Sequence, residues 1–148
     1  MAIPKAEASG LLPAGIHHCT LADIKERFGS FQRSDRRVKL FANLEKFVAE
    51  AKQSEIVRAL VLNGSFVTAE PVPNDIDLIV VVSGDHDFSE DLSPAEYNVL
   101  SKQRVRRRFE FDVLVAREGS IEYSRWTEFF QQVRLEPGRQ KGILRVAI

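Results

Sequence analysis

Residues 60–82, LVLNGSFVTAEPVPNDIDLIVVV, carry the strongest signal for the fold of this chain. They predict a strand over 57–63, a short helical turn that begins at Ser65, and a second strand over 76–82. Asp75 and Asp77 stand two positions apart, so both side chains lie on one face of an extended segment. Two like charges at the mouth of a core are unfavourable unless a cation neutralises them. The pair therefore predicts a divalent metal site, with Mg²⁺ as the first candidate.

Composition places the chain among ordinary globular proteins and excludes several classes. Its 148 residues suit a single domain, with 44% hydrophobic and 28% charged residues. A formal net charge of zero gives no strong signal for DNA binding. The single cysteine, Cys19, excludes an internal disulfide and a Cys-rich zinc site. With no apolar run of membrane-span length and no signal-peptide core, we expect a bacterial-type cytoplasmic protein without a membrane partner.

The first half of the chain predicts an arm followed by two helices. Residues 1–16 are rich in Pro, Gly and Ala and are expected to form an extended arm. Thr20 is the expected cap of a short helix over 21–28. A longer helix begins at a cap on Ser34 or Asp35, and its buried face is predicted to comprise Val38, Phe41, Leu44, Phe47, Val48 and Ala51. We accordingly divide the chain into an N-terminal arm and short helix, 1–34, and one domain, 35–148.

The second half alternates helices with strands. Ser93, Pro94 and Glu96 have the spacing of a helix start, with Tyr97 and Leu100 on its buried face. A third strand is predicted over 109–115, and a strand-like tail over 142–146. Between them Ser120 caps a helix whose inward residues are expected to be Tyr123, Trp126, Phe129, Phe130 and Val133, in the core or at a protein interface. The pattern predicts an α/β (α+β) fold with a small mixed sheet flanked by helices.

Asp112 is the best candidate for a third carboxylate, which a two-metal phosphoryl-transfer site usually requires. It lies in the predicted third strand on the face opposite Phe111 and Val113, where strand propensity disfavours Asp. The alternative is a surface position beside Glu110, which points the same way and could take the role instead. The nearby cluster 104–108 is either a solvated helix end or a phosphate site beside Asp112.

Gly-Ser, then Asp-x-Asp about ten residues later, then one Asp on a later strand, resembles the signature of the nucleotidyltransferase superfamily related to DNA polymerase β. The matching residues are Gly64, Ser65, Asp75, Asp77 and Asp112, and the resemblance covers roughly residues 36–116. The remainder of the chain resembles small bacterial proteins of uncharacterised function that are built on this fold.

The resemblance implies a minimal nucleotidyltransferase fold and a role for each matching residue. Gly64 and Ser65 would hold the triphosphate of an NTP such as ATP, assisted by backbone N–H groups. Asp75 and Asp77 would hold the metal that bridges the phosphates. Asp112 would share a second Mg²⁺ and would act as the base, or position one, for the attacking hydroxyl. Paired Mg²⁺ ions supply the charge neutralisation that this chemistry needs.

Two functions from different classes follow from this resemblance. The first is a Mg²⁺-dependent nucleotidyltransferase that moves an NMP from an NTP to a protein or RNA hydroxyl. Small stand-alone members of the superfamily include antitoxins and toxins, so a toxin–antitoxin or related two-component system with a cognate partner protein is one expected setting. The alternative is a non-catalytic, antitoxin-like module that binds a partner on the same fold.

Overall fold

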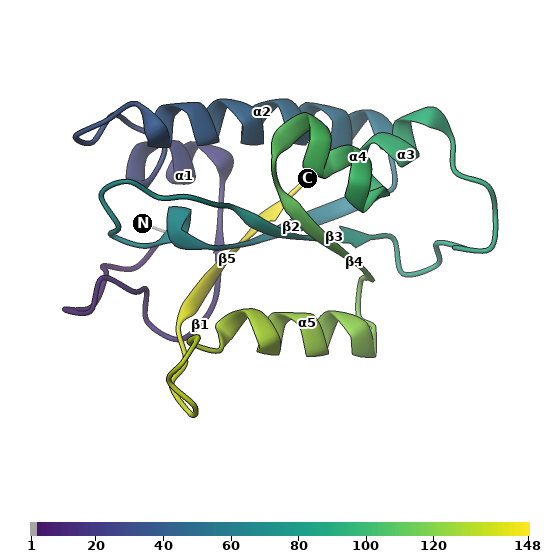
Figure 1. Ribbon diagram of the computed structural model, residues 1–148. Coiled ribbons are helices and arrows are strands. Elements are labelled where there is room, and N and C mark those ends of the chain that lie inside the picture. Colours follow the sequence, from purple (N-terminus) through teal and green to yellow (C-terminus); the bar gives the residue numbers. More distant parts are fainter. Residues whose placement is uncertain (1–2) are drawn as a thin grey trace.

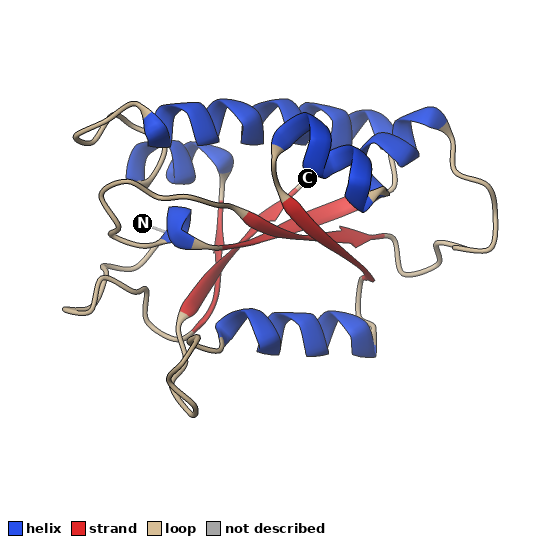
Figure 2. Cartoon of the chain, viewed as in Figure 1, coloured by secondary structure: helices blue, strands red, loops and turns tan. Residues whose placement is uncertain are grey.

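A mixed five-stranded sheet forms the centre of the molecule, as the computed structural model of residues 3–148 shows (Figures 1 and 2). The strand order is β1-β5-β2-β3-β4. Along the chain the elements are β1 Gly15–Cys19, α1 Leu21–Arg27, α2 Arg36–Ser54, β2 Val57–Asn63, β3 Asp77–Val82, α3 Pro94–Leu100, α4 Lys102–Phe109, β4 Asp112–Arg117, α5 Ile121–Gln131 and β5 Gly142–Ala147, with a short 3₁₀ turn at Ser65–Val67. The predicted α/β fold with a small mixed sheet flanked by helices is confirmed.

Strand pairing brings the end of β2 and the start of β3 next to the start of a later strand, β4. β2 is antiparallel to both of its neighbours, β5 and β3, whereas β3 and β4 are parallel, as are β1 and β5. Asn63 pairs with Asp77 across β2 and β3, and Asp77 pairs with Asp112 across β3 and β4. These three polar residues therefore form one row across three strands.

Helices cover both faces of the sheet, which therefore has two cores. Figure 1 shows α1 to α4 on one side and α5 alone on the other. Alternation along β2 and β3 explains the division: Leu60, Leu62, Leu78 and Val80 pack under α2, whereas Ala59, Val61, Ile79 and Val81 pack against α5. The sheet is buried on both faces, which accounts for the continuous apolar run of β3.

Helix starts follow the sequence closely. Thr20 and Asp23 form a reciprocal capping box at the start of α1, and Ser93 and Glu96 form another at the start of α3. Ser120 caps α5 by accepting a hydrogen bond from the Tyr123 N–H. These caps and the strands at 57–63 and 77–82 confirm the predicted positions to within a residue or two.

The predicted third strand over 109–115 begins too early. Residues 102–109 form α4, because Ser101 caps a run of good helix formers, and Glu110 ends that helix in a left-handed conformation at φ +63°. β4 starts only at Asp112, so the expectation that Glu110 shares its strand and its face is wrong. Asp112 itself lies on the predicted face, opposite the buried side chain of Val113.

Three apolar residues predicted to be buried are exposed instead. Val38 is 42% exposed on α2, Tyr97 is 45% exposed on α3, and Phe129 is 57% exposed on α5. Each residue lies at the edge of the apolar face that periodicity predicts for its helix. The face that is actually buried is narrower than the predicted one. In α3 and α5 the buried positions include Val99 and Thr127 in their place.

The segment before residue 35 joins the sheet. Gly15–Cys19 forms β1, an edge strand that pairs in parallel with β5. The sequence predicts an extended arm over 1–16 and no strand in this region. Within residues 3–148 no helix is both long enough and apolar enough to span a membrane.

Candidate functional site

The turn that leaves β2 requires glycine at position 64. Gly64 has φ +102° and ψ 177°, a backbone region that is essentially restricted to glycine. A Cβ atom at this position would lie 2.8 Å from the carbonyl oxygen of Asp75 and 3.1 Å from its Oδ1. The glycine of the Gly-Ser motif thus lets the start and the end of the 64–75 loop meet.

Ser65 holds Asp75 in this structure. Its backbone N–H and its hydroxyl both donate to Asp75 Oδ1, at 2.8 and 2.7 Å. The same hydroxyl accepts from the backbone N–H groups of Asn74 and Asp75, at 2.8 and 3.2 Å. The serine therefore has a positioning role that the sequence did not suggest, while its contact with a triphosphate stays a prediction.

Asp77 and Asp112 lie next to each other on the α5 side of the sheet. They are paired residues on parallel strands, so their side chains project from the same face. Asn63, paired with Asp77 on its other side, has a buried Oδ1 atom with no hydrogen-bond partner among the described residues. An unpartnered buried acceptor beside a partly buried carboxylate is unfavourable, and a donor or a cation would relieve both.

The electrostatics of Asp77 indicate a site with excess negative charge. Burial, together with the charges of Asp75 and Asp112, raises the pKa of Asp77 to about 6, against the opposing effects of Lys141 and Arg106. Lys141 is half-buried at the start of β5, and burial lowers its pKa although Asp77 and Asp75 act to raise it. The ammonium group thus compensates the acids only in part.

The carboxylates supply suitable oxygen ligands but do not form a closed ligand set. Asp112 Oδ1 is 2.8 Å from Arg106 Nη1, and Asp75 is engaged by Ser65. Among residues 3–148, no three His, Cys, Asp or Glu side chains are grouped closely enough to hold a metal. Carboxylate oxygens are the donors that Mg²⁺ prefers, and the side chains of Asp75 and Asp112 are both exposed, so the donor chemistry fits Mg²⁺ although the side chains are engaged elsewhere.

Two arginines at the start of α2 fix the loop that carries Ser65. Arg37 is 1% exposed, and its guanidinium donates to the carbonyls of Phe66, Thr68 and Glu70 at 2.6 to 2.7 Å. Arg36 donates to the carbonyls of residues 73 and 74. In a flexible loop these carbonyls would be hydrogen-bonded to water. Here they accept hydrogen bonds from two side chains of one helix, α2, which holds the loop in place.

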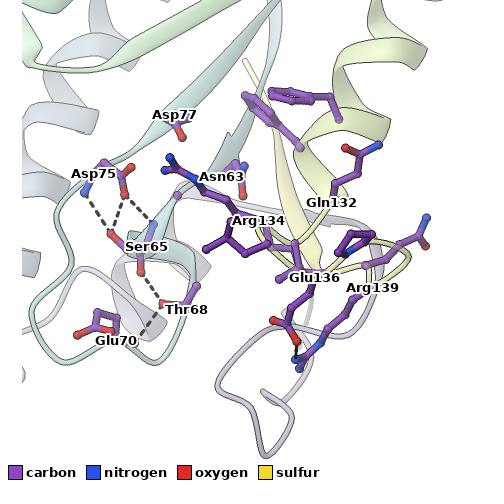
Figure 3. Close-up of a pocket in the computed structure, with 18 of the residues that line it drawn as sticks. Asn63, Ser65, Thr68, Glu70, Asp75, Asp77, Gln132, Arg134, Glu136 and Arg139 are labelled. Atoms are coloured by element: carbon purple, nitrogen blue, oxygen red, sulfur yellow. Dashed lines mark hydrogen bonds and ion pairs between the residues drawn. The ribbon is translucent and has the colours of Figure 1, made fainter.

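A cavity of about 1030 Å³ opens between this loop and the segment 132–141. Figure 3 shows Ser65, Asp75 and Asp77 on one side, with Arg134 reaching into the space from the opposite side. Glu136 and Arg139 form an ion pair at 2.8 Å further along that segment. One wall of the cavity is acidic and the other carries cations, so Arg134 and Lys141 are the groups with which an anionic ligand would pair.

Of the five residues that the sequence singled out, the structure joins Gly64, Ser65 and Asp75 in one turn and pairs Asp77 with Asp112 on adjacent strands. It adds Asn63, Lys141 and Arg134, which the sequence analysis missed. Asn63 directly precedes Gly64, so a polar residue at the end of an apolar strand was the available signal. For Lys141 and Arg134 no local signal exists, because their place opposite the acids depends on how β5 enters the sheet.

Comparison with known proteins identifies a family without assigning a function. Residues 4–147 match a family of unknown function (DUF6932). No curated protein and no solved structure shows significant similarity to the chain. The resemblance to nucleotidyltransferases therefore rests on the residues themselves.

Proposed function

The chain belongs to this family of unknown function, and we propose, from the site alone, that it is a Mg²⁺-dependent nucleotidyltransferase. It would bind an NTP in the large cavity and transfer the NMP to a hydroxyl group of a second substrate. The observation that carries the proposal is the pairing of Asp77 with Asp112 beside the Ser65–Asp75 turn. This arrangement puts three carboxylates at one end of two adjacent strands, next to a cavity of nucleotide size.

The reaction assigns a task to each group. The acceptor hydroxyl oxygen attacks the α-phosphorus, the bond to the β-phosphate oxygen breaks, and pyrophosphate leaves. Asp112 would take the hydroxyl proton, and Arg134 and Lys141 would bind phosphate oxygens. Asp75 and Asp77 would hold Mg²⁺, whose contribution would be to neutralise charge on the phosphates. Asn63, whose Oδ1 is unpartnered among the described residues, would interact with that ion or with its water.

Calorimetry and label transfer test this proposal together. The protein is titrated with each of the four NTPs in the presence and absence of Mg²⁺, and is then incubated with α- or γ-labelled NTP and candidate acceptors. We expect Mg²⁺-dependent binding, and transfer of the α label only. Asp77→Asn should lower transfer by about 100-fold or more, because it removes a carboxylate that would hold the ion stabilising charge in the transition state.

Asp91→Asn is the matched control, because Asp91 is an exposed carboxylate in the loop before α3. The control should leave binding and transfer unchanged. Transfer of the γ label would instead indicate a kinase. Equal transfer by Asp77→Asn and by the wild-type chain would remove the assigned site.

A non-catalytic partner-binding module is the second candidate. It is favoured by the Arg106–Asp112 ion pair, which keeps the third carboxylate away from a ligand set, and by the exposed side chains of Phe129 and Leu135. Leu135 is 92% exposed, and an apolar residue so exposed beside a cavity is a typical contact for another protein. Absence of NTP binding at millimolar concentration would support this function over the enzyme.

A further inference from the structure

Two cavities meet at Asp77, and only one of them is needed for an NTP. The second cavity, of about 330 Å³, is lined by seven residues: Asp77, Lys102, Asp112, Val113, Leu114, Phe129 and Phe130. Asp77, Phe129 and Phe130 also line the larger cavity. A group in the smaller cavity would therefore lie on the Asp112 side of Asp77, where the proposed proton acceptor is located.

The smaller cavity lies beside a helix with an unusual density of positive charge. α4 carries five cationic residues among its eight and no acidic residue: Lys102, Arg104, Arg106, Arg107 and Arg108. Because the whole chain has a formal net charge of zero, the rest of it carries a net negative charge. Cations are thus concentrated at one place, where they attract an anionic chain locally.

The charges of α4 are only partly compensated by the protein. Arg106 pairs with Asp112 and Arg108 pairs with Glu50. Within residues 3–148, no carboxylate lies in ion-pair distance of Lys102, Arg104 or Arg107, and all three are exposed. Figure 1 shows α4 above the β4 end of the sheet, and β4 is an edge strand, so an extended partner can approach from this side.

Phe129 adds a surface for stacking. Its ring is 57% exposed on α5, although an apolar side chain of this size is usually buried, and it borders both cavities. Phe129 and Lys102 line the same cavity, so an exposed aromatic ring and one cation of α4 border one space. Aromatic rings that stack on bases, combined with cations that contact the backbone, are how proteins hold single-stranded nucleic acid.

From these observations we infer that the second substrate is a polynucleotide, whose phosphates contact α4 and whose terminal hydroxyl enters the smaller cavity beside Asp112. The inference rests on the proposed nucleotidyl transfer for its chemistry, while its binding component stands on α4 alone. The cavity has room for about one nucleoside and not for a duplex, so a single-stranded end is the form that fits.

The test measures binding of fluorescent single-stranded 20-mers of RNA and of DNA to the full chain by anisotropy, over a range of salt. The variant Lys102→Gln/Arg107→Gln removes two of the uncompensated charges and keeps good helix formers. Its matched control is Lys5→Gln/Lys25→Gln, which removes two exposed lysines from the N-terminal segment and α1.

We expect the α4 variant to bind at least about tenfold more weakly, with a log–log salt slope reduced by about 1.4, since each phosphate contact on a single strand contributes about 0.7. The control should bind like the wild-type chain. Comparison of RNA with DNA identifies which strand is preferred. Equal loss in both variants, or no binding of either strand at 50 mM salt, overturns the inference, as does transfer of the label to a protein alone.

This design separates failure of the inference from failure of the proposed function. The α4 variant and its control should both bind NTP with Mg²⁺ like the wild-type chain, because none of the four substituted residues lines the larger cavity. Polynucleotide binding that depends on α4, in a chain that binds no NTP, would retain the docking surface and refute the transfer reaction. NTP binding without polynucleotide binding would refute the docking surface on α4 and leave the proposed transfer reaction standing.

Discussion

The two walls of the large cavity are built in opposite ways. The 64–75 loop is bound to α2 through the buried guanidinium of Arg37 and through Arg36, and it closes on itself through Ser65 and Asp75. The facing segment, 132–141, is mostly exposed and is held by a few backbone hydrogen bonds and one surface ion pair. The carboxylates are thus on the restrained wall and the cations Arg134 and Arg139 are on the adaptable one.

The contrast between the two walls explains how the fold can hold like charges together. Keeping Asp75 near Asp77 is electrostatically unfavourable, so other contacts must hold the backbone in place against this repulsion. Cations that meet a ligand need no such restraint, because attraction positions them when the ligand arrives. Equivalent substitutions on the two walls should therefore have unequal effects on stability.

Loss of the buried arginine should have the largest effect. We expect Arg37→Met to lower the free energy of unfolding by about 3 kcal/mol or more, because it leaves several loop carbonyls without donors. Arg139→Met on the other wall should cost less than about 0.5 kcal/mol, as is usual for an exposed ion pair. Urea denaturation of the two variants gives both values, and equal values would refute the contrast between the walls.

A glycine on each wall provides the second comparison. Gly64 and Gly138 both have positive φ, but a Cβ at 64 meets the Asp75 carbonyl whereas a Cβ at 138 has no atom within 4 Å. Gly64→Ala should therefore cost about 2 to 3 kcal/mol, from backbone strain and displacement of the loop. Gly138→Ala should cost about 1 kcal/mol, from strain alone. Thermal denaturation, with NTP binding as a second readout, distinguishes them.

The charge of Asp77 should destabilise the folded protein at neutral pH. Its pKa rises from about 3.9 in the unfolded chain to about 6 in the fold. The folded state therefore holds a proton between these values that the unfolded state has lost, and stability falls as pH rises through this window. Asp77→Asn should stabilise the metal-free protein at pH 7 by on the order of 1–2 kcal/mol, allowing for solvent screening.

The same substitution should have little effect at pH 4, where the carboxyl group is already protonated in the fold. Asp91→Asn is the control, because this exposed carboxylate in the loop before α3 is not among the groups that raise the pKa of Asp77, and it should not stabilise the protein at either pH. Denaturation curves at the two pH values measure both variants. A gain for Asp77→Asn that is the same at pH 4 and pH 7 would contradict an electrostatic cause.

The sequence predicts the restrained wall well because its determinants are local. A glycine before a serine, an Asp-x-Asp pair and an apolar run specify two strands and the turn between them, within about 25 residues. Capping boxes likewise placed α1 and α3 within one residue. Asp112 was placed on the correct face even though its strand starts later than predicted, because alternation alone determines the face.

Features that depend on distant pairing could not be predicted in the same way. Arg37 gives no signal of burial, since charged residues are seldom buried and its partners are backbone carbonyls some 30 positions away. Lys141 lies opposite the acids only because β5 inserts between β1 and β2. Helical periodicity predicts that Phe129 is buried, but its side chain is exposed. Such departures from a sequence rule are expected at binding sites.

Substitution of Arg134 should have the smallest effect on stability, and it examines the adaptable wall directly. Its side chain is exposed and reaches into the cavity, so Arg134→Gln should change the free energy of unfolding by less than about 0.5 kcal/mol. The same change should weaken Mg²⁺–NTP binding by about three- to tenfold, because one charge-assisted hydrogen bond to phosphate is lost. Calorimetry with an NTP and with the corresponding nucleoside separates phosphate contacts from base contacts. Arg125→Gln, an exposed arginine on α5 that lines neither cavity, is the control and should bind like the wild-type chain. If both arginine variants bind NTP equally well, cations of the exposed segment do not contact the ligand, and the adaptable wall serves some purpose other than phosphate binding.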